Sequence, residues 1–186
     1  MHNPDPKRLG EFWSSVQQMY MDMYGSRLAT VAAISGHSPA GGCIVSICCD
    51  YRIMIQDDSF KIGLNETQLG IRAPYWLADM YGQTIGTRQS EMHLALGTLF
   101  SPSKAHAVGL VDELSTNVRE RAQDEAAKWA KIPASGRYAT KQMVRQRFID
   151  ELLRRRQEDI DDFVNFVLRD DIQASIDGYL KALKKK

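Results

Sequence analysis

The segment Leu64-Asn65-Glu66-Thr67-Gln68-Leu69-Gly70-Ile71 places a single carboxylate in a stretch that is otherwise apolar or amide-bearing. No Lys or Arg occurs between Ile62 and Ile71 to pair with Glu66. A poorly solvated glutamate is expected to have a raised pKa, and a raised pKa makes it a usable general base near neutral pH. A lone glutamate in a loop is more often solvated, so the residues alone leave both interpretations open.

A second loop lies upstream, at Gly36-His37-Ser38-Pro39-Ala40-Gly41-Gly42-Cys43, and opens an apolar helix. The first N–H groups of a helix have no partner within it, and glycine lets a ligand approach the backbone closely. Gly41 is therefore the best candidate for an N–H that stabilises an oxyanion, although the glycine pair can equally form a simple tight turn. A base and an oxyanion donor together suggest proton transfer next to a thioester carbonyl.

The composition excludes several other classes of protein. The chain has 186 residues with 44% apolar residues and a net charge of +1, which argues against disorder and gives no sign of a nucleic-acid partner. The apolar run at residues 44–49 is too short for a membrane span. The three cysteines, two of them adjacent, indicate buried thiols in a reducing compartment. No zinc or dinucleotide motif occurs, and the chain shows no targeting segment.

Hydrophobic periodicity predicts a compact α/β part at residues 1–115 and an all-helical region at residues 116–186. In the first part we expect helices at residues 9–24, 43–49, 75–81, 88–96 and 102–108. Strands are expected at residues 28–34, 51–56, 60–63 and 110–113, with the strand at 28–34 buried on both faces. The second part is expected to contain four helices: one at 118–131, one from 135 past 148, one carrying residues 160–167, and one carrying residues 172–183.

The chain resembles the crotonase (enoyl-CoA hydratase/isomerase) superfamily in three segments. These are Ser35-Gly36-x-x-Pro39-Ala40-Gly41-Gly42-Cys43, Cys49-Asp50-Tyr51-Arg52-Ile53, and Gly63-Leu64-Asn65-Glu66-Thr67-Gln68-Leu69-Gly70-Ile71-x-Ala73-Pro74. Within the superfamily it looks most like the mitochondrial 3,2-trans-enoyl-CoA isomerase group, because Asn-Glu-Thr-Gln-Leu-Gly is specific to that group. The implied fold is a crotonase-like spiral of ββα units with a helical C-terminal region.

The resemblance also implies roles for individual residues. Glu66 matches the glutamate that shuttles a proton from C2 to C4 as 3-enoyl-CoA becomes trans-2-enoyl-CoA in fatty-acid β-oxidation. Gly41 matches an oxyanion-hole glycine, and Asn65 matches a residue that lines the substrate site. Hydratases of the superfamily carry a second glutamate where this chain has Ile44, which argues for isomerisation over hydration. No metal is implied, and CoA enters only as part of the substrate.

Three further residues are assigned to substrate binding: Gly42, Leu64 and Trp76. Trp76 follows the loop of Glu66 closely enough to line an acyl pocket, although tryptophans more often belong to a core or an interface.

The resemblance finally bears on the assembly, location and extent of the chain. The implied assembly is a trimer formed through the C-terminal helices, and the implied location is the mitochondrial matrix. Members of the group carry roughly another hundred residues before the point where Met1 aligns, so we expect a chain that is shortened at its N-terminus. Two alternatives remain open: a catalytically impaired chain that acts only as a subunit, and a different enzyme of the superfamily such as a hydratase.

Overall fold

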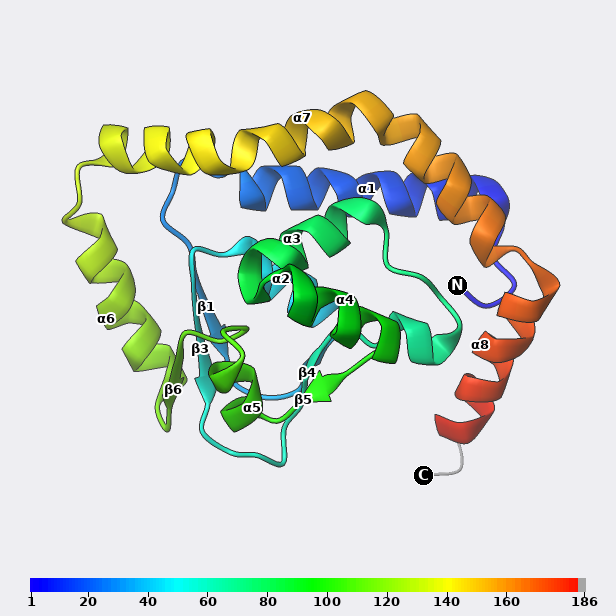
Figure 1. The fold of residues 1–186 in the computed structure, drawn as a ribbon, viewed down its shortest axis with the longest axis horizontal. Coiled ribbons are helices and arrows are strands. Elements are labelled where there is room, and N and C mark those ends of the chain that lie inside the picture. The colour runs from blue at the N-terminus through cyan, green and yellow to red at the C-terminus, as the bar shows by residue number, and fades with distance from the viewer. Residues whose placement is uncertain (184–186) are drawn as a thin grey trace.

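A computed structural model describes residues 1–183, which form a mixed α/β molecule dominated by helices (Figure 1). The helices are α1 (Pro6–Tyr24), α2 (Gly41–Cys48), η1 (Glu66–Leu69, a 3₁₀ helix), α3 (Tyr75–Ile85), α4 (Thr87–Leu96), α5 (Pro102–Ala107), α6 (Val118–Ala130), α7 (Ala134–Val167) and α8 (Asp170–Leu183). The strands are β1 (Val31–Ile34), β2 (Ser38–Pro39), β3 (Tyr51–Ile55), β4 (Ile62–Gly63), β5 (Leu99–Phe100) and β6 (Glu113–Ser115).

The strands form two small sheets. One is entirely parallel, with the order β1-β3-β6, as expected for strands that alternate with helices. The other has the order β2-β4-β5, in which β2 and β4 run parallel and β5 pairs antiparallel with β4. The sequence did not predict β2 or β5, because strands of two residues carry no periodicity that could be recognised.

Helices cover both sheets and enclose the main core. The long helix α7 runs alongside α1, and these two helices lie over α2 and α3 (Figure 1). The core between them includes Tyr20 of α1, Ile47 of α2, Trp76 of α3 and Leu152 of α7. At the other end of the molecule, α6 packs against β1 and β3 through a separate apolar cluster. The C-terminal helices thus share the core of the α/β part, and the boundary near residue 115 stays a prediction.

A buried ionic cluster fastens α7 to the parallel sheet. The carboxylate of Asp50, just before β3, lies 2.9 Å from Lys141 Nζ and 3.1 Å from Arg145 Nη2. The same carboxylate accepts the backbone N–H of Thr30, and Lys141 also donates to the carbonyl of Leu28. Each charge in this cluster therefore has a partner, which is the condition under which buried charges are tolerated.

The same cluster explains why the prediction for residues 28–34 was wrong. The strand begins only at Val31, Leu28 is 70% exposed, and Ala33 is exposed on the sheet edge. Before Val31 the N–H of Thr30 bonds to the Asp50 carboxylate and the carbonyl of Leu28 to Lys141, while the carbonyl of Thr30 accepts the N–H groups of Asp50 and Tyr51 at the start of β3. The apolar run therefore forms a short edge strand rather than a strand covered on both faces.

Among the other elements that differ from their predicted bounds, two have a clear physical reason. The strand expected at 110–113 is Glu113–Ser115, because the N–H groups of Leu110 and Val111 bond to the carbonyl of Ala105 at the end of α5. The two helices expected between residues 135 and 167 are one helix of 34 residues, α7, since no Gly or Pro occurs from residue 137 to residue 167 to interrupt it.

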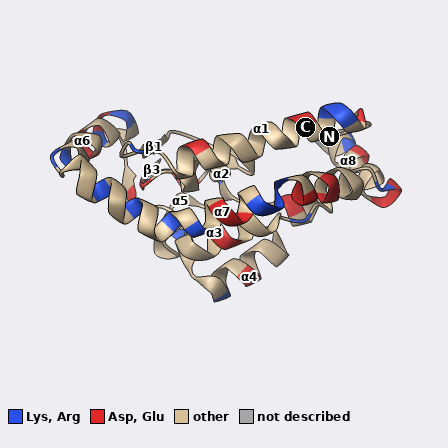
Figure 2. Cartoon of the chain, turned by 90° about the horizontal axis from the view of Figure 1, so that it is seen from above, with Lys and Arg blue, Asp and Glu red and all other residues tan. Residues whose placement is uncertain are grey.

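The three cysteines are free and buried, as expected. Positive and negative side chains are interspersed along α7 (Figure 2), in keeping with the small net charge. Among residues 1–183, no helix is both long and apolar enough to cross a membrane.

Candidate active site

Glu66 is the first residue of η1, in a loop that neighbouring helices hold in place. The Thr67 hydroxyl donates to the carbonyl of Leu94 at 2.6 Å, and the Ser175 hydroxyl of α8 donates to the carbonyl of Leu69 at 3.0 Å. Gly70 ends the turn in the left-handed region, at φ +74°, which glycine adopts without steric cost. The loop is therefore a fixed support for the carboxylate.

The Glu66 side chain is half-buried, and its Oε2 atom is fully shielded from solvent. Within the described part of the chain Oε2 has no hydrogen-bond partner, and no ion pair includes Glu66. Burial raises the pKa of the carboxyl above its ordinary value, and a hydrogen bond from its own N–H offsets part of that increase. The apolar flanks predicted this direction, which suits a general base.

Gly41 begins α2 directly after an unusual backbone conformation. Ala40 has φ +47° and ψ −112°, and its N–H donates to the carbonyl of Gly63 at 2.8 Å. A residue other than glycine rarely adopts a positive φ, and residues held in such a conformation often lie at functional sites. No atom lies within 4 Å of where a Cβ at Gly41 would be, so its outer side is open to a ligand.

Strand register brings the two loops to the same edge of the second sheet. β2 and β4 run parallel, with Ser38 opposite Ile62 and Pro39 opposite Gly63. The residues after β2 include Gly41, and those after β4 lead to Glu66 within three positions. Because parallel strands end at a common edge, the segment that begins α2 and the segment that carries Glu66 leave the sheet on the same side. This arrangement can remove a proton beside a carbonyl and stabilise the resulting oxyanion.

The other residues predicted for the site lie at different depths. Asn65 is half-buried directly before Glu66, whereas Leu64 is buried in the core beneath it. A Cβ at Gly42 would lie 2.7 Å from the Ser38 hydroxyl, so Gly42 allows α2 to pack against β2. Ile44, at the position of the hydratases' second glutamate, is buried and apolar.

Trp76 is not brought to this edge of the sheet. It is 1% exposed, and its Nε1–H donates to Asp159 of α7 at 3.2 Å. Its ring lies against those of Trp13 and Tyr20 in the main core. This environment is that of a core residue.

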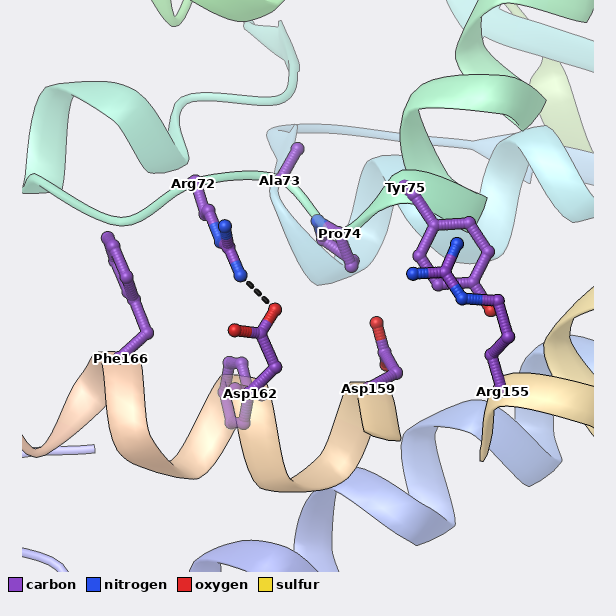
Figure 3. A pocket seen from close by; sticks show the side chains of 9 residues that line it. Arg72, Ala73, Pro74, Tyr75, Arg155, Asp159, Asp162 and Phe166 are labelled. Carbon is purple, nitrogen blue, oxygen red and sulfur yellow. Dashed lines mark hydrogen bonds and ion pairs between the residues drawn. The ribbon is translucent and has the colours of Figure 1, made fainter. Parts of the chain in front are cut away.

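A cavity of about 270 Å³ lies between the loop after Glu66 and α7 (Figure 3). Arg72 reaches across it to Asp162, and the Arg155 guanidinium lies over the ring of Tyr75. Arg155 also pairs with Glu158. None of the residues predicted for the site lines this cavity. Elsewhere in residues 1–183, no three His, Cys, Asp or Glu side chains gather in a way that could hold a metal ion.

Comparison with known proteins identifies the family. The model of the enoyl-CoA hydratase/isomerase family matches residues 1–186. The chain belongs to this family. The resemblance seen in the three sequence segments is thereby confirmed, and so is the crotonase-like fold that it implied.

Relatives within the enoyl-CoA hydratase/isomerase family are similar over the whole chain. Mouse mitochondrial enoyl-CoA delta isomerase 1 is 45% identical over 188 residues, which cover all of this chain and 65% of the mouse protein. The human protein of the same name is 43% identical over 183 residues, covering 97% of this chain and 61% of its own length. The chain thus spans just under two thirds of the curated relatives that it matches.

Solved structures agree with this assignment. The crystal structure of human mitochondrial delta3-delta2-enoyl-CoA isomerase superimposes with a TM-score of 0.97 at 42% identity, covering 99% of this chain and 72% of that one. A putative enoyl-CoA hydratase from Mycobacterium avium paratuberculosis gives a TM-score of 0.82 at 19% identity, over 95% of this chain and 69% of that one. The second match shows the fold alone.

Two buried residues near Glu66 were not assigned to the site from the sequence. Cys43, on the first turn of α2, was interpreted only as a buried thiol, and Tyr81 of α3 only as part of a helix. Both are shielded from solvent, and the charge of Glu66 contributes to raising the pKa of each, after the larger effect of burial. No sequence motif marks them, because it is the packing of α2 and α3 that brings them toward Glu66.

Proposed function

We propose that this chain isomerises 3-enoyl-CoA to trans-2-enoyl-CoA in the β-oxidation of unsaturated fatty acids. The observation that carries the proposal is the buried, unpaired carboxylate of Glu66 at the sheet edge where α2 begins. The 45% identity to a mouse enoyl-CoA delta isomerase supports this choice of reaction within the family. The substrate is accordingly an acyl-CoA.

The reaction moves one proton and one double bond. The Glu66 carboxylate takes a proton from C2. The C2–H electron pair forms a C1–C2 double bond as the C1=O pair moves onto the thioester oxygen, which gives a dienolate with its negative charge on that oxygen and the C3–C4 double bond still in place. The Gly41 N–H stabilises that oxygen, as a helix N-terminus stabilises anions. The C1=O bond then reforms, the C1–C2 pair becomes the C2–C3 double bond, and the C3–C4 pair takes at C4 the proton that Glu66 carries. Glu66 ends as a carboxylate, so the cycle consumes no co-reactant and needs no cofactor or metal.

The substitution Glu66→Gln tests the role of the base. Glutamine keeps the size of the side chain but cannot accept the proton, so turnover should fall by about 10² or more. The measurement follows formation of the conjugated thioester from a 3-enoyl-CoA by the purified protein. Glu91→Gln is the matched control, because Glu91 is exposed and pairs with the exposed Arg88.

Two outcomes would count against the proposal. A near-normal rate for Glu66→Gln would remove the assignment of the base. Absence of conversion by the unsubstituted protein, with normal circular dichroism, would instead favour a chain that joins other subunits without turning over substrate.

Hydration is the rival reaction within the family, and Ile44 argues against it. Activating water between two carboxylates requires a second acid, whereas Ile44 supplies a buried apolar side chain. Incubation with a trans-2-enoyl-CoA should leave the conjugated absorbance nearly constant. Hydration as fast as isomerisation would show that one carboxylate is sufficient here.

Assembly and location follow from the same proposal. Large apolar side chains are exposed on or beside α7, namely Ile132, Met143, Val144 and Leu153, and they support a trimer formed through the helical region. Light scattering coupled to size-exclusion chromatography should then report three chains, and a monomer at micromolar concentration would contradict this.

The mitochondrial names of the relatives support a mitochondrial location, which cell fractionation would test.

A further inference from the structure

The last helix, α8, lies against the loop that carries Glu66 (Figure 1). Ile172 and Ile176 are four positions apart, so they share one face of α8, and both are buried. They form an apolar cluster with Ile71, the second residue after η1. This cluster is separate from the main core, so α8 is packed on the segment that holds the proposed base.

One side-chain hydrogen bond crosses the same interface. The Ser175 hydroxyl donates to the carbonyl of Leu69, the last residue of η1, at 3.0 Å, and this bond is partly buried. The carbonyls of Asn65, Glu66 and Thr67 accept backbone N–H groups within the loop. The last carbonyls of a helix have no such partner within it. Ser175 therefore gives Leu69 a bond that η1 cannot make with its own backbone.

Gly70 allows α8 to approach the loop closely. A Cβ at Gly70 would lie 3.1 Å from Oγ of Ser175 and 3.4 Å from its Cβ, so a side chain at this position would crowd Ser175. The Gly70 backbone has φ +74°, which also favours glycine. Ser175 thus contacts the turn that ends η1 directly, and a shift of α8 is passed to that turn.

A backbone hydrogen bond connects the interface to the base itself. The N–H of Ile71, whose side chain lies in the cluster with α8, donates to the carbonyl of Glu66 at 3.0 Å. The buried Oε2 atom of Glu66 has no hydrogen-bond partner among residues 1–183. The position of this carboxylate therefore depends on the backbone that carries it, and α8 holds that backbone.

The side chain of Gln173 holds α8 at its other contacts. Its Oε1 atom accepts the N–H of Asn3 at 2.8 Å. Its Nε2 atom donates to the carbonyl of Val167 at 2.7 Å and to that of Met1 at 3.1 Å. Because Val167 is the last residue of α7, one carboxamide joins α8 to α7 and to the N-terminal segment. α8 is therefore fixed independently of the loop that it supports.

We propose that Ser175 is a positioning residue for Glu66, because its hydroxyl fastens η1 to α8 and so fixes the carboxylate that exchanges the proton. Ser175 acts through the backbone of the loop and not on the reacting atoms. The inference rests on the proposed role of Glu66 as the base. Without the hydroxyl, fewer molecules hold the carboxylate in its aligned position, so kcat falls while KM changes little.

The test compares Ser175→Ala with Ser90→Ala. Ser90 of α4 is a matched control, because its buried hydroxyl also donates to a carbonyl of another element, that of Ala78 in α3, at 3.4 Å. Alanine favours the helix at both positions, so neither variant weakens its own helix.

We expect kcat for a 3-enoyl-CoA to fall about two- to tenfold in Ser175→Ala, the range that the loss of one neutral hydrogen bond allows, with KM nearly unchanged. Both constants should stay near those of the unsubstituted protein in Ser90→Ala. An unchanged kcat in Ser175→Ala, a rise confined to KM, or an equal fall of kcat in both variants would overturn the inference while leaving the proposed isomerase function intact.

A second measurement does not depend on activity. Amide hydrogen exchange, followed by NMR, reports on the N–H groups of Gly70 and Ile71, which bond to the carbonyls of Thr67 and Glu66. Their exchange should become faster in Ser175→Ala and stay unchanged in Ser90→Ala. Unchanged exchange in Ser175→Ala overturns the inference whether or not the protein is an isomerase. Faster exchange, together with no turnover by the unsubstituted protein, supports the contact of α8 with the loop and counts against the proposed function.

Discussion

At Glu66 the requirements of folding conflict with those of proton transfer. Burial without a counterion raises the pKa of its carboxyl, so the folded protein holds this proton up to a higher pH than the unfolded chain does. Stability therefore falls as the pH rises from the ordinary value of 4.5 through the folded pKa, and the loss persists above it. An ionised Glu66 is useful to the proposed reaction and unfavourable for the fold.

This conflict predicts that Glu66→Gln stabilises the protein while it lowers turnover. The melting temperature at pH 7 should rise relative to the unsubstituted protein, and the difference should shrink toward pH 4, where the native carboxyl becomes protonated. Thermal unfolding at the two pH values measures this. Glu91→Gln, on an exposed pair, should change little at either pH. A lower melting temperature for Glu66→Gln at pH 7 would contradict the argument.

The sequence predicts Glu66 and not its buried neighbours, for a physical reason. The apolar residues that desolvate Glu66 lie within a few positions of it, so a local pattern reveals its environment. Tyr81 is 15 positions away on another helix, and only the packing of α3 against α2 brings it near. For Trp76 the closeness in sequence to Glu66 suggested a substrate contact, whereas the packing places its ring beside Trp13 of α1 and Asp159 of α7.

At the scale of elements, the short strand β4 depends on Gly63. The φ of Gly63 is +148°, a backbone conformation that residues with a side chain rarely adopt. A Cβ at this position would lie 2.3 Å from the carbonyl oxygen of Thr98. The carbonyl of Gly63 also accepts a hydrogen bond from the N–H of Ala40, the residue directly before α2, and this bond fixes where α2 begins. The glycine therefore lets β4 and β5 approach closely and aligns the loop of Gly41 with that of Glu66.

We predict that Gly63→Ala lowers the free energy of unfolding by at least about 2 kcal/mol, from backbone strain and the clash with Thr98. Gly136→Ala is the control, because Gly136 lies in α7 with open space around it and should gain about 0.5–1 kcal/mol. Urea unfolding of both variants measures the difference. Equal stabilities would show that the β4–β5 contact relaxes to accommodate a methyl group.

Element types were predictable here more often than their bounds. The helices α1, α2, α4 and α6 were all predicted, and their observed limits lie within three residues of the predicted ones. The single helix α7 was divided in the prediction because its apolar face changes neighbours along its length, from the ionic cluster at Asp50 to the core beside α1. β1 was overextended because apolar composition does not reveal where a ladder partner is absent.

Across the whole molecule, three helices meet at one buried carboxylate. Asp159 of α7 accepts three hydrogen bonds at Oδ2: from Trp13 Nε1 at 2.8 Å, from Gln17 Nε2 at 2.8 Å, and from Trp76 Nε1 at 3.2 Å. The donors come from α1 and α3, as far as 146 positions away in the sequence. No sequence pattern indicates such a junction, because Asp159 lies in a charged stretch that is typical of an exposed helix face.

The junction gives the final prediction. Asp159→Ala removes the acceptor from three donors that remain buried, and each unsatisfied donor costs about 1–3 kcal/mol. The free energy of unfolding should therefore fall by about 3 kcal/mol or more. Asp159→Asn keeps one acceptor oxygen and should lose less. Because α3 follows the loop of Glu66 and α7 contacts it, loosening the junction should also lower the proposed isomerase activity of the folded protein.

Asp162→Ala provides the matched control on the same helix. Asp162 pairs with Arg72 at an exposed position, where ion pairs contribute about 0–1 kcal/mol (Figure 3). Urea unfolding followed by tryptophan fluorescence measures all three variants, since Trp13 and Trp76 report directly on the junction. If Asp159→Ala were no less stable than Asp162→Ala, the helices would be held together by apolar packing alone, and Asp159 would be a tolerated carboxylate rather than the point that joins them.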